Sequence, residues 1–211
     1  SWKQCVLNNL PRIMKITIIT AAYNSASTIK DTICSVNRQD YPNIEHIIID
    51  GGSKDKTLEI VNEYAQRISI VLSEPDNGIY DAYNKGLAKA TGDVIGFLNS
   101  DDFYFSPTVI SKVAESFLDE SVDAVYGNLV YVDQEDVNRI SRLWKSQPYV
   151  EGIFAKGFVP PHPTFFLRKS VYDQVGGYDT SYRLAADFQL MLRAFLSAHV
   201  RNSQYISHKI I

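Results

Sequence analysis

Residues 77–102 read NGIYDAYNKGLAKATGDVIGFLNSDD, a helix-forming segment that leads into a short apolar run and an acidic turn. Residues 79–90 have the apolar spacing of a helix, and Gly92 suits its C-terminal end. Residues 94–98, VIGFL, are uninterrupted and apolar, which is typical of a parallel strand covered on both faces. This order predicts a crossover helix followed by a buried strand that ends in polar side chains.

The same alternation continues towards the N-terminus. Apolar, β-branched runs at 16–20, 44–50 and 68–73 predict strands, and the spacing within 28–38 and 57–65 predicts helices. After the strand at 94–98, Ser106-Pro107 predicts the start of a helix that runs to about residue 118. Repeated strand–helix units indicate parallel strands with right-handed crossovers. Such sheets bind ligands at the carboxyl ends of their strands.

The second half has a different pattern. We expect strands at 124–132, 140–143 and 164–167, a helix at 169–175 that stops at Gly176-Gly177, and another helix within 184–196. The chain shows no internal repeat, low-complexity segment or obvious linker. We therefore expect both halves to share one sheet and one core.

Composition limits the class of protein. The 211 residues are 45% hydrophobic and include 21 Lys and Arg against 24 Asp and Glu, a net charge of −3. These values exclude a coiled coil and a disordered tail, and without a basic surplus the chain is not expected to bind a nucleic-acid polymer. Two cysteines make neither a disulfide framework nor a zinc site, which favours a reducing compartment. No apolar run reaches the length of a membrane span.

Polar and acidic residues follow each of the first four strands. They lie in the segments 21–24 (AAYN), 50–55 (DGGSKD), 74–78 (EPDNG) and 99–102 (NSDD). Carboxylates repel a diphosphate, so their expected use is to hold a hard divalent cation, which then binds the phosphates. No GxGxxG or GxxxxGK[ST] motif is present, so dinucleotide and P-loop sites of those kinds are excluded.

Four blocks together resemble family 2 glycosyltransferases: 16–24, 50–55, 77–102 and 186–193 (ADFQLMLR). The resemblance implies the α/β GT-A fold, a Rossmann-like, mostly parallel sheet with helices on both faces. It implies one domain over 14–211, with a nucleotide-binding half at 14–102 and an acceptor-binding half at 103–211. Residues 1–13 are expected to be an upstream segment, because Met14 precedes the first strand. The end at 204–211 resembles a strand that relatives follow with further chain.

The resemblance also implies roles for individual residues. Asp187 matches the proposed catalytic base, and Asp102 matches the metal ligand for Mn²⁺ or Mg²⁺. His162 is either a ligand of metal or phosphate or a packing residue. Two positions depart from the family pattern, since Asn99 and Ala186 replace acidic residues. The residues implied to bind the nucleotide-sugar are Thr20, Ala22, Tyr23, Asp50, Asp76, Asn84, Lys85, Asn99, Ser100 and Asp101.

Aromatic rings are expected beside this pocket, where Tyr23, Tyr80 and Tyr83 can stack on a base or sugar. One of the two helical tyrosines, Tyr80 and Tyr83, can equally belong to the core. Lys85 can assist departure of the diphosphate or can be a solvated helix lysine.

By analogy we expect the chain to be an inverting hexosyl- or N-acetylhexosaminyltransferase. It would move one sugar from a nucleotide-diphospho-sugar to a saccharide or lipid-linked acceptor. UDP is the commonest nucleotide carrier in such donors. The absence of a QxxRW motif favours single rather than processive transfer. The analogy predicts an enzyme of bacterial polysaccharide assembly that lies in the cytoplasm, with peripheral contact at the inner face of the membrane. The sequence leaves the oligomeric state open. Alternatives are a degenerate domain that only binds a nucleotide sugar or partner, and a sugar nucleotidylyltransferase. The latter is disfavoured because AAYNSAS lacks the basic, glycine-rich loop such enzymes use.

Overall fold

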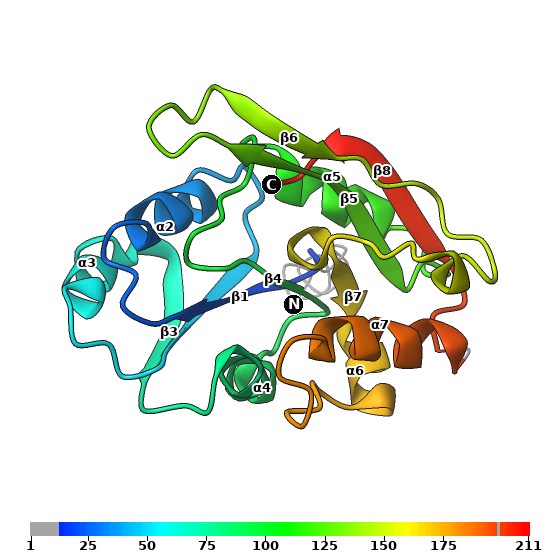
Figure 1. The fold of residues 1–211 in the computed structure, drawn as a ribbon, viewed down its shortest axis with the longest axis horizontal. Coiled ribbons are helices and arrows are strands. Elements are labelled where there is room, and N and C mark those ends of the chain that lie inside the picture. Colours follow the sequence, from blue (N-terminus) through cyan, green and yellow to red (C-terminus); the bar gives the residue numbers. More distant parts are fainter. Residues whose placement is uncertain (1–12, 198) are drawn as a thin grey trace, which may run out of the picture.

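The computed structural model describes residues 13–197 and 199–211, so the expected upstream segment lies outside the described residues apart from Ile13. The chain forms an eight-stranded mixed sheet in the order β3-β2-β1-β4-β7-β5-β6, with β8 paired to β5 (Figure 1). The strands are β1 (Ile16–Ala22), β2 (Ile44–Asp50), β3 (Ile68–Ser73), β4 (Val94–Phe97), β5 (Ala124–Val132), β6 (Ile140–Trp144), β7 (Phe166–Arg168) and β8 (Ser203–Lys209). The expected α/β fold with a mostly parallel core sheet is confirmed.

The first four strands are parallel, as the strand–helix alternation predicted. β1 pairs with β2 and with β4, and β2 pairs with β3. β7 then runs antiparallel to β4, and β5 antiparallel to β7, so the second half extends the same sheet. β1 and β4 are buried along their whole length, whereas β3, at the edge, alternates between half-buried and exposed residues.

Helices cover both faces of the sheet. They are α2 (Ile29–Asn37), α3 (Thr57–Glu63), α4 (Ile79–Lys89), α5 (Val109–Ser116), α6 (Lys169–Val175) and α7 (Ala186–Leu196), with 3₁₀ turns at Ala65–Arg67, Phe154–Lys156 and His162–Thr164. α4, α6 and α7 pack in one core cluster, and α2, α3 and α5 pack in clusters against the other face. Alternate side chains of β1 enter the two layers: Ile19 joins the first and Ile18 the second.

Two elements start two or more residues later than predicted. The helix expected from Ser106 begins at Val109, and the Pro107 carbonyl accepts a bond from the amide of Asp40, a residue far away in the sequence (2.9 Å). The Ser106 hydroxyl contacts the Thr108 hydroxyl (3.2 Å) and caps no amide. The strand expected from residue 164 begins at Phe166, since Thr164 ends a 3₁₀ turn.

Candidate functional site

A pocket of about 410 Å³ lies at the carboxyl ends of β1 and β4, beside the start of α4. Six of the residues expected to bind a nucleotide sugar line it together: Ala22, Tyr23, Asp76, Asn99, Ser100 and Asp101. The wall also includes Ala21, Ser25, Gly78, Ile79 and Ala82, which the motifs did not single out. Tyr23 is 63% exposed, so its ring is free to contact a ligand.

The β1 and β2 ends support this pocket from behind. Asp50 is fully buried, and its carboxylate accepts bonds from the amides of Gly52 and Ser53 (both 3.1 Å) and from the hydroxyls of Ser53 and Ser73. Thr20 is also fully buried and bonds His46 Nε2 (3.1 Å). Neither side chain lines the pocket. The structure therefore places Asp50 as the organiser of the DGGSKD loop and Thr20 in the core.

Two expected donor-site residues of α4 also point elsewhere. The Lys85 ammonium donates to the Pro75 carbonyl (2.8 Å) and pairs with Glu74 (3.0 Å) and Asp81 (3.5 Å), so it closes the loop that carries Asp76. Asp76 itself accepts a bond from the Gly78 amide (2.9 Å) and faces the pocket.

Asn84 bonds the backbone of Tyr178 at two points. Its amide nitrogen donates to the Tyr178 carbonyl and its oxygen accepts from the Tyr178 amide, both at 2.8 Å. This clasp ties α4 to the segment that precedes α7.

The acidic turn after β4 holds two neighbouring carboxylates under different conditions. Asp101 is exposed and lines the pocket, while Asp102 is half-buried. Burial, together with the charge of Asp101, raises the pKa of Asp102 to about 6, although a bond from Asn99 Nδ2 (2.9 Å) opposes the rise. Asn99 also accepts a bond from the Tyr83 hydroxyl through its amide oxygen. The uncharged Asn99 thus positions Asp102 without adding a third negative charge.

These carboxylates are compatible with a hard divalent cation. Within residues 13–197 and 199–211, no group of three or more His, Cys, Asp or Glu side chains could hold a metal by itself. Magnesium is commonly bound through one or two carboxylates, with substrate phosphates and water supplying the other oxygens. A partly desolvated carboxylate repelled by its neighbour is the kind of group that a cation stabilises.

Asp187 lies in the first turn of α7 and accepts a bond from the Tyr80 hydroxyl of α4 (3.0 Å). The two residues are 107 positions apart, and no motif linked them. Burial, reinforced by the charge of Asp187, raises the pKa of Tyr80 to about 12, so the phenol remains a donor over the whole range in which enzymes work. The Tyr80 ring stacks on Tyr178 with centroids 5.7 Å apart.

His162 belongs to an aromatic cluster beside this pair. Its Nε2 bonds the Tyr178 hydroxyl (2.8 Å), and its ring stacks on Tyr83 at 5.5 Å. Burial lowers the pKa of His162 to about 4, partly offset by Asp187, so the imidazole is neutral at pH 7. These contacts are those of a packing residue, with one nitrogen already engaged. Tyr83 is 2% exposed and is a core residue, not a stacking platform.

Comparison with known proteins agrees with this architecture. The model of glycosyl transferase family 2 matches residues 17–184. A protein named as an uncharacterized glycosyltransferase of Mycobacterium tuberculosis is 33% identical over 184 residues, which cover 86% of this chain and 69% of the relative.

Solved structures show the same fold. Residues 1–349 of S. aureus TarS superpose with a TM-score of 0.74 at 25% identity, covering 93% of this chain and 59% of that one. TarS has also been solved with UDP-GlcNAc. A mannosyltransferase from Pyrobaculum calidifontis, solved with GDP-Man and Mn²⁺, has a TM-score of 0.68 at 18% identity, covering 99% of this chain and 61% of that one. The chain thus spans less than two thirds of either solved protein. Among the described residues no helix has the length and apolar character needed to cross a bilayer.

Proposed function

The chain belongs to glycosyltransferase family 2, and we propose that it is an inverting enzyme that moves one sugar from a nucleotide-diphospho-sugar to a hydroxyl of a saccharide or lipid-linked acceptor. The supporting observation is the pocket at the strand ends, where six of the expected residues converge from three separate segments of the chain. UDP is the proposed carrier, with a hexosyl or N-acetylhexosaminyl group transferred. Residues 14–102 form the donor half in this proposal and residues 103–211 the acceptor half. We place the reaction in the cytoplasm, at the inner face of the membrane.

The proposed donor orientation follows from what lines the pocket. Tyr23 offers an exposed aromatic face, which suits the base, and Asp76 offers a carboxylate for hydroxyl groups of the ribose or sugar. Asp101 and Ser100 lie at the β4 end, where they meet the diphosphate and sugar. Asp102, aided by Asp101, is the proposed ligand of Mn²⁺ or Mg²⁺. When bound, that ion offsets the charge that grows on the leaving diphosphate.

Asp187 is the proposed base. Its carboxylate accepts the proton of the acceptor hydroxyl as that oxygen attacks the anomeric carbon, and the bond to the diphosphate breaks on the opposite side. The Tyr80 hydroxyl bonds one carboxylate oxygen, Oδ1, and so fixes the orientation of the group. Because His162 is neutral at pH 7, it neither competes for this proton as a strong base nor pairs with Asp187 as a cation. One base and one displacement give inversion.

The test is release of UDP from a panel of UDP-sugars in the presence of Mn²⁺ or Mg²⁺ and candidate acceptors. Asp187→Asn should lower kcat by about 10²–10⁴-fold, the usual contribution of a general base, with donor affinity retained. Glu120→Gln, which removes an exposed carboxylate outside the pocket, should leave kcat unchanged. Turnover by Asp187→Asn at the wild-type rate would show that Asp187 is not the base.

The metal assignment has its own test. Asp102→Ala should abolish the metal-dependent part of UDP binding, measured by calorimetry with and without Mn²⁺. If Asp102→Ala binds UDP with the same metal dependence as wild type, the cation is held elsewhere. Binding of UDP-sugars by wild type without any turnover would instead favour a degenerate, binding-only domain.

A further inference from the structure

Asn24 follows Tyr23 just after the end of β1, and its backbone conformation is unusual. Among residues 13–197 and 199–211 it is the only residue other than glycine with a positive φ, which is 50°. Asparagine adopts this left-handed region more readily than most residues, but the conformation is uncommon and is concentrated at functional sites, where surrounding contacts hold it. Asn24 is exposed and does not line the pocket at the strand ends. Any effect of Asn24 on that pocket must therefore pass through a neighbouring residue.

Two hydrogen bonds hold Asn24 to the DGGSKD loop. Its backbone amide donates to Ser53 Oγ (2.8 Å), and its side-chain oxygen, Oδ1, accepts from the Lys54 amide (2.9 Å). Ser53 is in turn bonded to the buried carboxylate of Asp50 through both its amide (3.1 Å) and its hydroxyl. A line of hydrogen bonds therefore runs from the core of the sheet through Ser53 to Asn24.

The next two residues are anchored to the same part of the chain. The Ser25 amide donates to Oγ1 of Thr57, the first residue of α3 (2.8 Å), and the Ala26 amide donates to Asp55 Oδ2 (3.1 Å). Tyr23, which precedes this anchored turn, is 63% exposed and lines the pocket. The direction in which its ring projects is therefore set by β1 on one side and by the anchored turn on the other.

We propose that Asn24 is a positioning residue, which holds the Tyr23 ring in the orientation that stacks on the base of the nucleotide-sugar. The left-handed turn at Asn24 directs the chain towards the DGGSKD loop and leaves the preceding side chain on the pocket. A different conformation at Asn24 rotates the peptide that joins it to Tyr23, and the exposed ring moves with that peptide. The inference rests on the proposed function for the identity of the ligand, whereas the contacts that position Tyr23 are independent of it.

The first experiment measures the Kd for UDP by calorimetry in the presence of Mn²⁺. Asn24→Ala removes the Oδ1 acceptor and leaves a residue that tolerates a positive φ poorly, so we expect the Kd to rise about fivefold or more. Asn24→Gly removes still more of the side chain, but glycine adopts a positive φ readily, so we expect a smaller rise of about twofold. Wild-type affinity in Asn24→Ala, or weaker binding by Asn24→Gly than by Asn24→Ala, would contradict the proposal.

A double-mutant cycle shows whether Asn24 acts through Tyr23. Tyr23→Ala should weaken UDP binding about tenfold, because it removes the ring that stacks on the base. In the Tyr23→Ala background, Asn24→Ala should have no further effect on the Kd, since no ring remains to be positioned. If the two effects multiply instead, Asn24 acts on the ligand without Tyr23 and the proposal is wrong.

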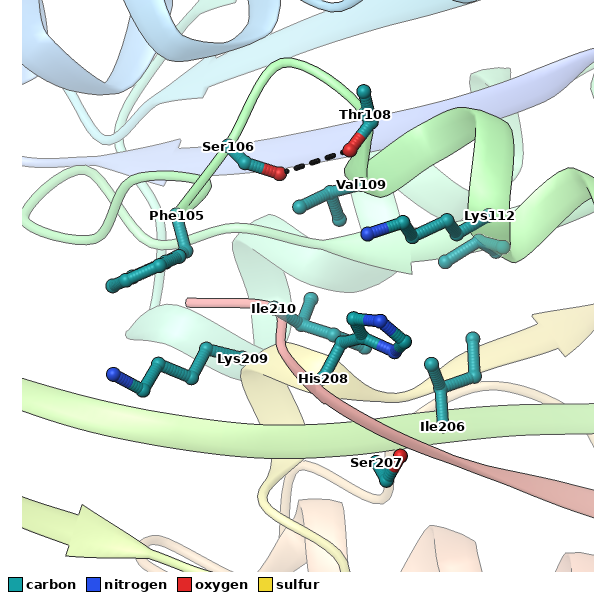
Figure 2. Close-up of a pocket in the computed structure, with 11 residues that line it drawn as sticks. Phe105, Ser106, Thr108, Val109, Lys112, Ile206, Ser207, His208, Lys209 and Ile210 are labelled. Carbon is teal, nitrogen blue, oxygen red and sulfur yellow. Dashed lines mark hydrogen bonds between the residues drawn. The ribbon is translucent and has the colours of Figure 1, made fainter.

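The matched control is Thr108→Ala, which also removes a side-chain oxygen from an exposed loop residue. The contact that it breaks is with the Ser106 hydroxyl (3.2 Å). Thr108 lines a hollow between α5 and β8 that shares no lining residue with the pocket at the strand ends (Figure 2). Thr108→Ala should therefore bind UDP as wild type does, and unchanged melting temperatures will show that the variants fold. A loss equal to that of Asn24→Ala would overturn the specific role of Asn24.

A measurement without ligand separates this inference from the proposed function. 3-Fluorotyrosine placed at position 23 reports on the ring through its ¹⁹F NMR signal. In Asn24→Ala we expect the chemical shift to move towards the value of the urea-unfolded protein, and in Asn24→Gly to stay close to that of the Asn24 protein. Failure of wild type to bind UDP would reject the proposed donor site and leave this result standing. An unchanged ¹⁹F shift in Asn24→Ala would reject the positioning role itself.

Discussion

Replacing Tyr80 with phenylalanine tests the contribution of a single hydrogen bond, which joins α4 to the proposed base Asp187. The substitution removes only the hydroxyl that donates to Asp187 Oδ1 at 3.0 Å. The ring remains, so its stacking on Tyr178 and its edge contact with Tyr83 (6.1 Å) are retained. What changes is the orientation of the carboxylate, which becomes free to rotate away from the acceptor hydroxyl.

The size of the effect follows from the bond. A hydrogen bond to a charged group contributes about 1.5–3 kcal/mol, and each 1.4 kcal/mol in the barrier changes a rate by about tenfold. Tyr80 and Asp187 are half-buried rather than enclosed, so we take the lower end and expect about a tenfold fall in kcat. The donor KM should not change. Because the pKa of Tyr80 is about 12, the ratio of wild-type to variant kcat should stay constant between about pH 6 and pH 9.

The control is Tyr41→Phe, which also removes a hydroxyl that donates to oxygen, here the Met14 carbonyl at 2.6 Å. It lies before β2 and away from the pocket, so it should lower the melting temperature while kcat is unchanged. Steady-state UDP release and thermal unfolding measure both quantities for each variant. The reasoning is refuted if Tyr80→Phe keeps wild-type kcat, or if its loss appears entirely in KM.

Three further predictions concern other contacts. Lys85→Met should raise the donor Kd about threefold with kcat unchanged, because the loop that carries Asp76 loses its surface ion pairs, each of which contributes about 0.2–1 kcal/mol. Calorimetry with UDP measures the Kd, and an unchanged Kd contradicts the prediction. Gly86→Ala should lower the free energy of unfolding by about 1–3 kcal/mol in urea, since the added methyl group meets Ile19 of β1; a more stable variant would mean that the helix can move. His46 is fully buried, and burial lowers its pKa from 6.5 to about 3. Between these pKa values only the unfolded chain binds that proton. The free energy of unfolding of wild type should therefore fall by about 2 kcal/mol more than that of His46→Leu between pH 7 and pH 5. Urea unfolding at both pH values measures this, and an equal fall in the two proteins would contradict it.

Much of the fold was predictable from local pattern. The strands Ile44–Asp50 and Ile68–Ser73 and the helix Lys169–Val175 have the boundaries that their apolar runs and flanking turn residues indicated. The start of α5 was not predictable, because the hydrogen-bond acceptor for an amide of its first turn is remote in the sequence. The Ile110 amide donates to Gln39 Oε1 at 3.0 Å. Residues 71 positions apart leave no local signal of such a cap.

For the candidate site, the residues at strand ends were predictable from the sequence, whereas the contacts of residues on α4 were not. Side chains at or shortly after the end of a strand, such as Ala22, Tyr23 and Asp101, lie in the pocket because parallel strands end at one edge of the sheet. Residues on α4 were harder to place, since the direction of a helical side chain depends on its packing. Asn84 and Lys85 are adjacent, yet one holds Tyr178 and the other holds the loop before α4. The partnership of Tyr80 with Asp187 needed the fold.

The position of α4 has a consequence for how donor and acceptor binding are coupled. In the proposed reaction α4 supplies Ile79 and Ala82 to the pocket that binds the donor, and the same helix supplies Tyr80 to Asp187. A donor that displaces α4 therefore also displaces the hydroxyl that aligns the base. Thermodynamic linkage is reciprocal. If donor binding changes the affinity for the acceptor by some factor, acceptor binding changes the affinity for the donor by the same factor. In the proposed reaction, donor binding and the alignment of Asp187 are therefore coupled through α4.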